Sequence, residues 1–254
     1  MLIDTHTHLY VTEFDTDRGE VITRAMESGV LQFVLPAIDS ETTEAMHALK
    51  RDYPNNMHLM MGLHPIHVGD TVAEELAHVY AQLQQHQFVA VGEIGMDLYW
   101  DKAYKKAQQE AFAQQIVWAL EFDLPIVIHC REAFDEIFEV LEGVKDAKLR
   151  GVFHCFTGNA AQARRAIDLN MYIGIGGVVT FKNAGLSETL AQIPLASVVL
   201  ETDSPYLAPT PHRGKRNESS FLPLILAKVA AVYGLSVEEM SKMTTQNAKK
   251  LFCI

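Results

Sequence analysis

Residues 125–154 read PIVIHCREAFDEIFEVLEGVKDAKLRGVFH and contain the pattern that decides the fold. Two apolar runs, Pro125–His129 and Gly151–His154, flank a stretch with helical periodicity, Ala133–Leu141. Runs rich in Val, Ile and Phe are typical of strands that are buried on both faces, as in a parallel sheet. The stretch therefore predicts a strand–helix–strand unit in which each strand ends in a histidine.

The same alternation continues along the chain in both directions. The other predicted strands are Leu2–His6, Gln32–Pro36, Met57–Gly62, Phe88–Glu93, Tyr172–Gly176 and Val198–Thr202. Helical patterns are expected at Gly19–Glu27, Glu41–Arg51, Val72–Gln85, Ala103–Phe122, Ala160–Leu169 and Ser187–Gln192, with further helices from Ser220 onward. Strands that alternate with helices in this way favour an α/β protein with a TIM-like (β/α)8 barrel, formed by a single domain of residues 1–254. An open doubly wound sheet is the alternative, but no glycine-rich phosphate-binding motif follows the first strand.

Composition and charge narrow the class of protein. No apolar run approaches the roughly 20 residues that span a bilayer, so we expect no membrane segment. The N-terminus MLIDTHTHL lacks the apolar stretch of a signal peptide, and the three cysteines form no disulfide framework, which favours a cytoplasmic protein. The net charge of −11 argues against a protein that coats nucleic acid, but not against an enzyme that acts on a strand end. Nothing in the sequence indicates an obligate protein partner.

Residue types that bind metals fall at or just after the ends of the predicted strands. They are His6 and His8 on the first strand, Glu93 on the fourth, His129 on the fifth, His154 on the sixth and Asp203 after the eighth. The carboxyl ends of barrel strands share one rim, where barrel active sites form. Each residue has an ordinary alternative, such as a hydrogen-bonded core histidine or an aspartate in a turn. Their joint position at one rim favours a metal site.

The number of candidate ligands predicts two divalent ions, because a typical catalytic zinc has three protein ligands. We expect His6, His8 and Asp203 on one ion, His129 and His154 on the other, and Glu93 as a bridge between them. A hydroxide held by the metals would be the nucleophile and Asp203 its general base. Zinc, manganese and magnesium all remain candidates. Asp4 and Glu201 could orient the imidazoles, or form a salt bridge in the barrel.

The order of the motifs resembles the TatD family of metal-dependent hydrolases. The motifs are Asp-Thr-His-Thr-His (4–8), Gly-Leu-His-Pro (62–65), Gly-Glu-Ile-Gly-Met-Asp (92–97), Pro-Ile-Val-Ile-His-Cys-Arg (125–131), Phe-His-Cys-Phe-Thr-Gly (153–158), Glu-Thr-Asp-Ser-Pro-Tyr-Leu (201–207) and His-Arg-Gly-Lys-Arg-Asn-Glu (212–218). The resemblance implies a TIM-like barrel, a dinuclear metal site at the residues above and, often, deoxyribonuclease activity, including 3′-to-5′ exonuclease action. One departure is Ser219-Ser220, where the family usually has proline after Asn-Glu, in a loop that could contact substrate.

Further residues are candidates for substrate binding. They are His64, Arg131, Arg213 and Asn217, the last two in a basic segment that also contains Lys215 and Arg216. Arginine at the catalytic face suits phosphate binding. The ordinary alternatives are a structural hydrogen bond for His64, a salt bridge for Arg131 and a solvated run of charges for the basic segment. Cys130 and Cys155 each follow a candidate ligand and are expected to be packed core thiols.

Three functions are compatible with these residues. The first is hydrolysis of phosphodiester bonds at a DNA strand end by a two-ion site. The second is hydrolysis of an amide or ester, in which the same ions polarise a carbonyl group of a small molecule or an aminoacyl-RNA. The third is a metal-binding scaffold without catalysis, which open coordination positions make the weakest of the three.

Overall fold

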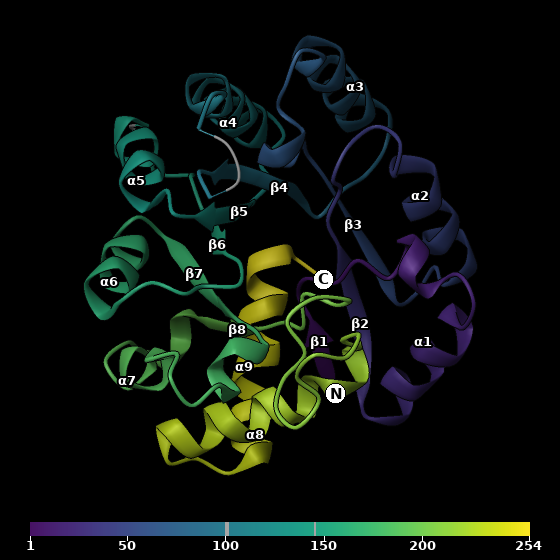
Figure 1. Ribbon diagram of the computed structural model, residues 1–254, viewed down its shortest axis with the longest axis vertical. Helices are drawn as coiled ribbons and strands as arrows, with labels where there is room; N and C mark the ends of the chain where they lie inside the picture. Colours follow the sequence, from purple (N-terminus) through teal and green to yellow (C-terminus); the bar gives the residue numbers. More distant parts are fainter. Residues whose placement is uncertain (100–101, 145) are drawn as a thin grey trace.

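The stretch quoted above folds as a strand–helix–strand unit. In the computed structural model, which describes residues 1–99, 102–144 and 146–254, it consists of β5 (Ile126–Arg131), α5 (Phe134–Gly143) and β6 (Gly151–Phe153). The two strands are parallel neighbours, with Val127 opposite Val152. The helix packs outside them (Figure 1).

The strands form one eight-stranded sheet in the order β1 to β8, and every pair of neighbours is parallel. The remaining strands are β1 (Leu2–Asp4), β2 (Val30–Leu35), β3 (Met57–Met61), β4 (Ala90–Asp97), β7 (Met171–Ile175) and β8 (Val198–Leu200). Backbone hydrogen bonds from Thr5 N to Leu200 O and from Asp203 N to His6 O join the segment that directly follows β1 to the end of β8 and the residues after it. The predicted barrel is therefore confirmed, and the open doubly wound sheet is excluded.

Helices surround this barrel, as Figure 1 shows. They are α1 (Arg18–Glu27), α2 (Thr43–Asp52), α3 (Val72–Gln85), α4 (Lys105–Glu121), α5, α6 (Ala160–Asp168), α7 (Leu186–Leu190) and α8 (Leu222–Tyr233), whereas α9 (Val237–Phe252) lies across one end of the barrel. Short 3-10 helices occur at η1 (Thr12–Phe14), η2 (Pro65–His67), η3 (Gly177–Thr180), η4 (Leu195–Ser197) and η5 (Ser219–Phe221). No single helix in the described ranges is long and apolar enough to cross a membrane. The segment of η5 and α8 has the required length and composition only when it is combined with α9, and the two are bent by 105°.

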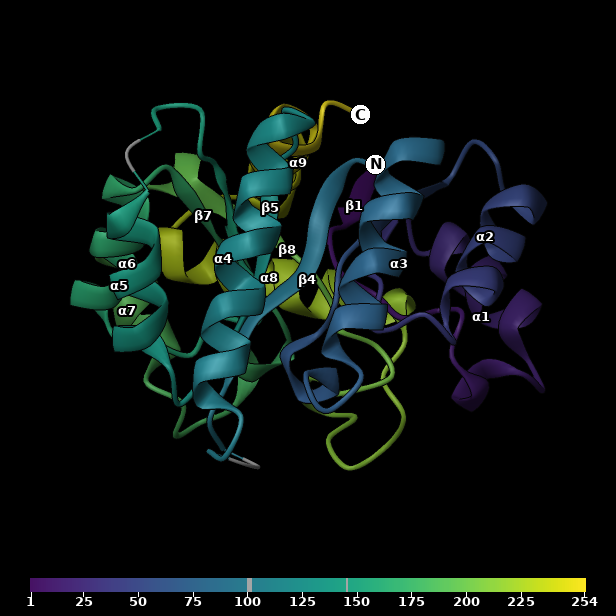
Figure 2. The same ribbon diagram turned by 90° about the horizontal axis from the view of Figure 1, so that it is seen from above.

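The inside of the barrel is a separate apolar layer, closed at one end by α9. Its buried members are Ile3, Val34, Met60, Ala90, Val127, Val152 and Val199 from the strands, and Ala248, Leu251 and Phe252 from α9. Figure 2 shows both termini at this end and the long loop after β8, in light green, at the other. Because apolar side chains fill the amino end of the barrel, the site is left to form at the carboxyl end.

Two strand boundaries differ from the expectation in a way that matters for the site. β4 continues to Asp97, so Glu93 lies inside the strand and not at its end. The register against β5 shifts between Val91 and Ile94, and Ala37 exchanges backbone hydrogen bonds with residues 92 and 93. β1 ends at Asp4, so His6 and His8 lie in the segment that follows it.

We predict that Phe252→Ala lowers the free energy of unfolding by about 3–5 kcal/mol, because the ring is 2% exposed and its removal leaves a cavity in the layer that closes the barrel. Urea unfolding followed by circular dichroism measures the change. Val237→Ala, at a side chain that is 50% exposed on the same helix, is the control and should shift the free energy by much less. Equal effects of the two changes would contradict the role of Phe252.

Candidate metal centre

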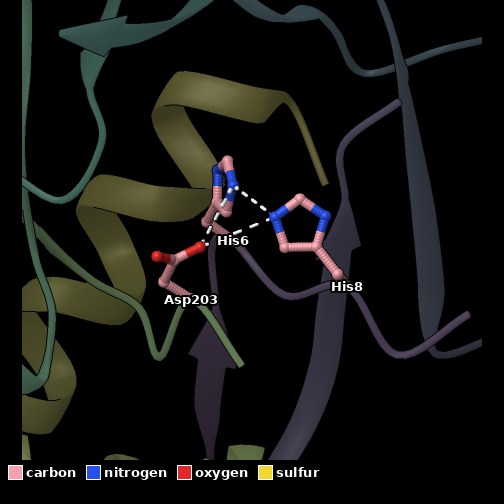
Figure 3. Close-up of side chains that lie close together, drawn as sticks. All are labelled: His6, His8 and Asp203. Atoms are coloured by element: carbon pink, nitrogen blue, oxygen red, sulfur yellow. Dashed lines mark hydrogen bonds and ion pairs between the residues drawn. The ribbon is translucent and has the colours of Figure 1, made fainter. Parts of the chain in front are cut away.

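The candidate ligands converge at the carboxyl end of the barrel. Figure 3 shows His6, His8 and Asp203 pointing toward one another. The Nε2 atoms of His6 and His8 are 3.3 Å apart, and Asp203 Oδ1 lies 3.8 Å from the first and 3.5 Å from the second. All three residues are buried. Residues that are separated by almost 200 positions therefore share one small volume.

Glu93 lies at the centre of the cluster, and its two oxygens face different imidazoles. Oε2 is 3.2 Å from His6 Nε2 and 3.8 Å from His8 Nε2. Oε1 is 2.7 Å from His154 Nε2 and 2.8 Å from His129 Nδ1. A carboxylate with this environment can serve two groups of ligands at once.

The glycines on either side of Glu93 allow β4 to approach β5 closely. A Cβ atom on Gly92 would lie 2.7 Å from the Cβ of Val127, and one on Gly95 would overlap the His129 carbonyl group. Gly95 also has a φ of 136°, which side chains rarely adopt. The absence of side chains at these two positions therefore permits the close approach. This approach brings Glu93 and His129, on neighbouring strands, within hydrogen-bond distance of each other.

Burial and neighbouring charges set the protonation of the cluster. Burial alone raises the pKa of Glu93, but the surrounding imidazoles, His154 foremost, hold it well below its usual range. Burial lowers the pKa of His154, whereas the charge of Glu93 raises it well above its usual value. Glu93 therefore remains ionised at neutral pH, and in the metal-free chain protons on histidines offset its charge. A cation that binds here would replace such protons.

The donor set fits a divalent cation. Among the described residues, three groups of donors lie close enough to hold an ion: His6, His8 and Asp203; His6, Glu93 and His154; and His64, Glu93 and His129. Imidazole nitrogens and carboxylate oxygens are ordinary ligands of zinc and related ions. Within the described ranges, the ion-pair partners of Glu93 and Asp203 are all histidines, with no lysine or arginine. The expected second set is close as well, since Glu93 Oε1 lies 2.8 Å from His129 Nδ1 and 2.7 Å from His154 Nε2, and these two nitrogens are 3.4 Å apart. The cluster therefore has the chemistry of a cation site.

Hydrogen bonds on the far side of the rings leave the inward nitrogens available. The Tyr10 hydroxyl donates to the Pro36 carbonyl at 2.6 Å, so its oxygen can accept the proton on His8 Nδ1, 3.2 Å away. Asp97 Oδ2 is 3.0 Å from His129 Nε2. Partners of this kind fix the tautomer of a ligating histidine and its orientation.

Tyr10 and Asp97 were not identified from the sequence as site residues. Asp97 lies four positions after Glu93 on β4, and the two-residue period of a strand puts both side chains on one face. That period was an available signal for Asp97. For Tyr10, which lies in the loop after β1, the sequence contains no comparable signal.

Asp4 and Glu201 have different positions relative to the imidazoles. Glu201 Oε1 lies 3.6 Å from His154 Nδ1, within ion-pair distance, and accepts a hydrogen bond from the Cys155 amide. Asp4 instead accepts hydrogen bonds from the amide and hydroxyl of Thr202, at 2.9 and 2.6 Å. Asp4 therefore joins β1 to the loop after β8 and does not contact an imidazole ring.

His64 is closer to the centre than a rim residue would be. Its Nε2 is 3.3 Å from Glu93 Oε1, while its Nδ1 accepts a hydrogen bond from the Ile66 amide. Burial lowers the pKa of His64 to about 4, so the ring is neutral and its Nε2 carries the proton. A protonated Nε2 is a hydrogen-bond donor, which favours contact with a carboxylate or substrate oxygen over binding to a metal.

A pocket of about 480 Å³ opens above the cluster. Arg131 lines it, with its guanidinium 3.7 Å from the centre of the Tyr99 ring. Apolar side chains form part of the wall, namely Ile38, Ile66, Val178 and Leu207. Cys130 and Cys155 also line the pocket and are half-buried. Cys130 packs against the hydrophobic core, as predicted, whereas for Cys155 the prediction of a core thiol is wrong. The turn after β6, where Cys155 has a φ of 43°, turns this residue to the rim.

The basic segment after β8 does not enter this pocket. Arg213 stacks on Phe181, with 4.1 Å between the guanidinium carbon and the ring centre. Arg216 forms ion pairs with Asp17 and Glu218, at 2.6 and 3.2 Å. The ion pairs of Arg216 hold the loop in place. Arg213 lies against Phe181, at a surface outside the pocket.

Asn217 and Ser219 are fully buried. The amide of Asn217 donates to the carbonyls of Thr202 and Tyr206, both at 2.7 Å, and so shapes the loop instead of facing the pocket. Ser219 occupies the position of the family's usual proline, and its Oγ lies 3.2 Å from the hydroxyl of Thr7. Thr7 is the residue between His6 and His8 in the sequence. Neither Asn217 nor Ser219 can reach a substrate in this arrangement, because each is enclosed by the chain.

Comparison with known proteins identifies the family. The family model described as "TatD related DNase" matches residues 3–253. The chain belongs to the TatD family. This TatD-family chain is 40% identical to the uncharacterized metal-dependent hydrolase YabD of Bacillus subtilis over 100% of both chains, and 32% identical to the 3′-5′ ssDNA/RNA exonuclease TatD of Pantoea ananatis over 99% of both. Its fold matches YJJV, a TatD homologue from Escherichia coli K12, with a TM-score of 0.94 and 29% identity, covering 100% of this chain and 98% of that one. The chain is a metal-dependent hydrolase.

We predict that Tyr10→Phe weakens zinc or manganese binding by roughly 10–100-fold, because His8 Nδ1 loses the oxygen that holds its proton outward. Isothermal titration calorimetry of the metal-free protein measures this change. Tyr206→Phe is the matched control, since the Tyr206 ring meets His8 edge-on at 5.8 Å and, within the described ranges, its hydroxyl forms no hydrogen bond with His8. Unchanged affinity in Tyr10→Phe would show that the hydroxyl does not orient His8.

Proposed function

We propose that this TatD-family hydrolase binds two divalent ions and cleaves phosphodiester bonds of single-stranded DNA, removing nucleotides from the 3′ end. The position of Glu93 carries the proposal. One of its oxygens faces His6 and His8, and the other faces His129 and His154. A carboxylate with imidazoles on both sides is suited to bridge a pair of ions.

The ligand residues would divide around this carboxylate. One ion would be held by His6, His8 and Asp203, the other by His129 and His154, and both by Glu93. When bound, a pair of divalent ions stabilises the charge on attacking and leaving oxygens of an in-line displacement. Imidazole donors suit zinc, and the carboxylates suit manganese or magnesium as well.

Asp203 is the residue that we assign as general base. Its carboxylate lines the pocket and is 8% exposed. Burial raises the pKa of Asp203, but the hydrogen bond to His8 and the nearby imidazoles lower it below the usual range. The carboxylate is therefore ionised at neutral pH and can accept a proton from the attacking water. His64 and Arg131 line the same pocket, where an imidazole N–H and a guanidinium are groups that can donate to phosphate oxygens.

The walls of the pocket support a substrate with unpaired bases. Tyr206 lines the pocket and is 47% exposed, and the neighbouring Leu207 and Ile66 are 44% and 53% exposed. Aromatic and apolar side chains of this kind stack on single-stranded bases, whose faces are covered in a duplex. The relative from Pantoea ananatis is named as an exonuclease of single-stranded DNA and RNA, which agrees with this choice.

Hydrolysis of an amide or ester is the alternative for the same centre. The observation in its favour is charge: among the described residues that line the pocket, Arg131 is the sole lysine or arginine, on a chain with a net charge of −11. A neutral acyl substrate would need no further cation. Activity on acyl esters or amides without cleavage of phosphodiesters would favour this alternative.

We predict that Asp203→Asn lowers kcat for single-stranded DNA by about 10²–10⁴-fold, because the amide cannot accept a proton from water. Oligonucleotides labelled at the 5′ or the 3′ end, incubated with zinc, manganese or magnesium, report the rate and the direction of cleavage. Asp15→Asn is the control, since Asp15 is exposed and pairs with Arg18 outside the pocket. Failure of the metal-loaded wild type to cleave, or full activity of Asp203→Asn, would refute the proposal.

A further inference from the structure

A second cavity lies beside the catalytic pocket, between the loops that follow β7 and β8. It has a volume of about 620 Å³ and is lined by Thr180, Phe181, Lys182, Asn183, Ala184, Thr210 and Arg213. None of these lining residues is acidic, whereas the catalytic pocket contains Glu93, Asp97 and Asp203. The second cavity is therefore lined by cations without carboxylates, whereas carboxylates and imidazoles share the catalytic pocket.

Both loops contribute to both cavities. Val178 in η3 and Leu207 after β8 line the catalytic pocket, while Thr180 and Thr210, a few residues further along each loop, line the second cavity. The loops touch each other directly, since the Thr210 amide donates to the Thr180 hydroxyl at 2.9 Å. A strand that leaves the catalytic pocket past Val178 and Leu207 would next meet this second cavity.

The cations of the second cavity are not neutralised by the chain. Within the described ranges, no carboxylate lies within ion-pair distance of Lys182 or Arg213, and both residues are exposed. Arg216, three positions after Arg213, is instead paired with Asp17 and Glu218. On an acidic protein, two adjacent cations without carboxylate partners create a local positive potential that favours an anion.

Stacking on Phe181 gives the Arg213 guanidinium a defined place. One of its faces covers the ring at 4.1 Å, which leaves its edge available to form paired hydrogen bonds with a phosphate group. The other face can stack on a base, as arginine does with single strands. In barrels, the loops after the seventh and eighth strands are frequent places for phosphate binding.

We propose that Arg213 and Lys182 form a second subsite, which binds a phosphodiester of the DNA strand beyond the bond that is cut. This inference rests on the proposed function. It assigns to Arg213 a role away from the reacting atoms, in holding longer strands. The subsite should therefore affect long substrates and have no effect on short ones.

The test compares Arg213→Ala, Lys182→Ala and the double variant with the wild type, all loaded with manganese. Lys215→Ala is the matched control, because Lys215 is an exposed cation of the same loop that does not line the cavity. The substrates are a thymidine dinucleotide, a thymidine octanucleotide and bis(4-nitrophenyl) phosphate. Steady-state rates give KM and kcat for each, and fluorescence anisotropy gives the Kd of a labelled octanucleotide on the Asp203→Asn background.

We expect the double variant to raise KM and Kd for the octanucleotide by roughly 10-fold or more, as the loss of charged hydrogen bonds predicts. Its kcat, and all constants for the dinucleotide and the small diester, should stay within twofold of the wild type. The slope of log Kd against log salt should fall by about one for each cation removed.

Two failures can be told apart. If the wild type cleaves the octanucleotide and the double variant has the same KM and Kd, the second subsite is refuted and the proposed function stands. If the wild type cleaves none of these diesters, the proposed function is refuted. In that case anisotropy decides the subsite: an unchanged Kd in the double variant refutes it, and a 10-fold weaker Kd supports it as an anion-binding surface.

Discussion

The carboxylate of Glu93 is 2% exposed and is held among imidazoles on both sides, and the rest of the site is arranged around it. A buried carboxylate needs compensating charge or hydrogen bonds, since its transfer from water to the protein interior is costly. Histidine protons supply that compensation in the free chain, and a cation can supply it in their place. The requirement explains why so many imidazoles face one small volume and why their far sides contact Tyr10, Asp97 and Glu201.

In the barrel, the apolar packing and the polar site lie at opposite ends of the axis. At the amino end, one apolar layer from the strands packs against Phe252 and its neighbours on α9. At the carboxyl end, polar side chains replace that layer, and the chain adopts left-handed backbone conformations just after β6 and β8. Asp203 adopts a φ of 57° and Cys155 one of 43°, conformations that direct the rim residues into the site. The apolar end provides the stability that permits this costly arrangement.

Charge distinguishes the surroundings of the site. The catalytic pocket combines carboxylates with apolar walls, whereas the adjoining cavity between the loops after β7 and β8 contains Lys182 and Arg213 without acidic lining. The chain has a net charge of −11, so its surface as a whole does not attract a polyanion. The cations of this cavity provide that attraction locally, beside the reacting groups. An enzyme of this kind would bind a strand locally and would not coat it.

The sequence by itself determined the barrel and the residues of the cluster, because both depend on period and order along the chain. Apolar runs that end in His129 and His154 require their side chains to meet once the strands are parallel neighbours. Only the tertiary structure decided how the cluster is connected. The register shift that places Glu93 within β4, the hydroxyl of Tyr10 behind His8, and the burial of Asn217 all depend on contacts between distant segments. No local pattern encodes such contacts, because each depends on where another strand or loop lies in space.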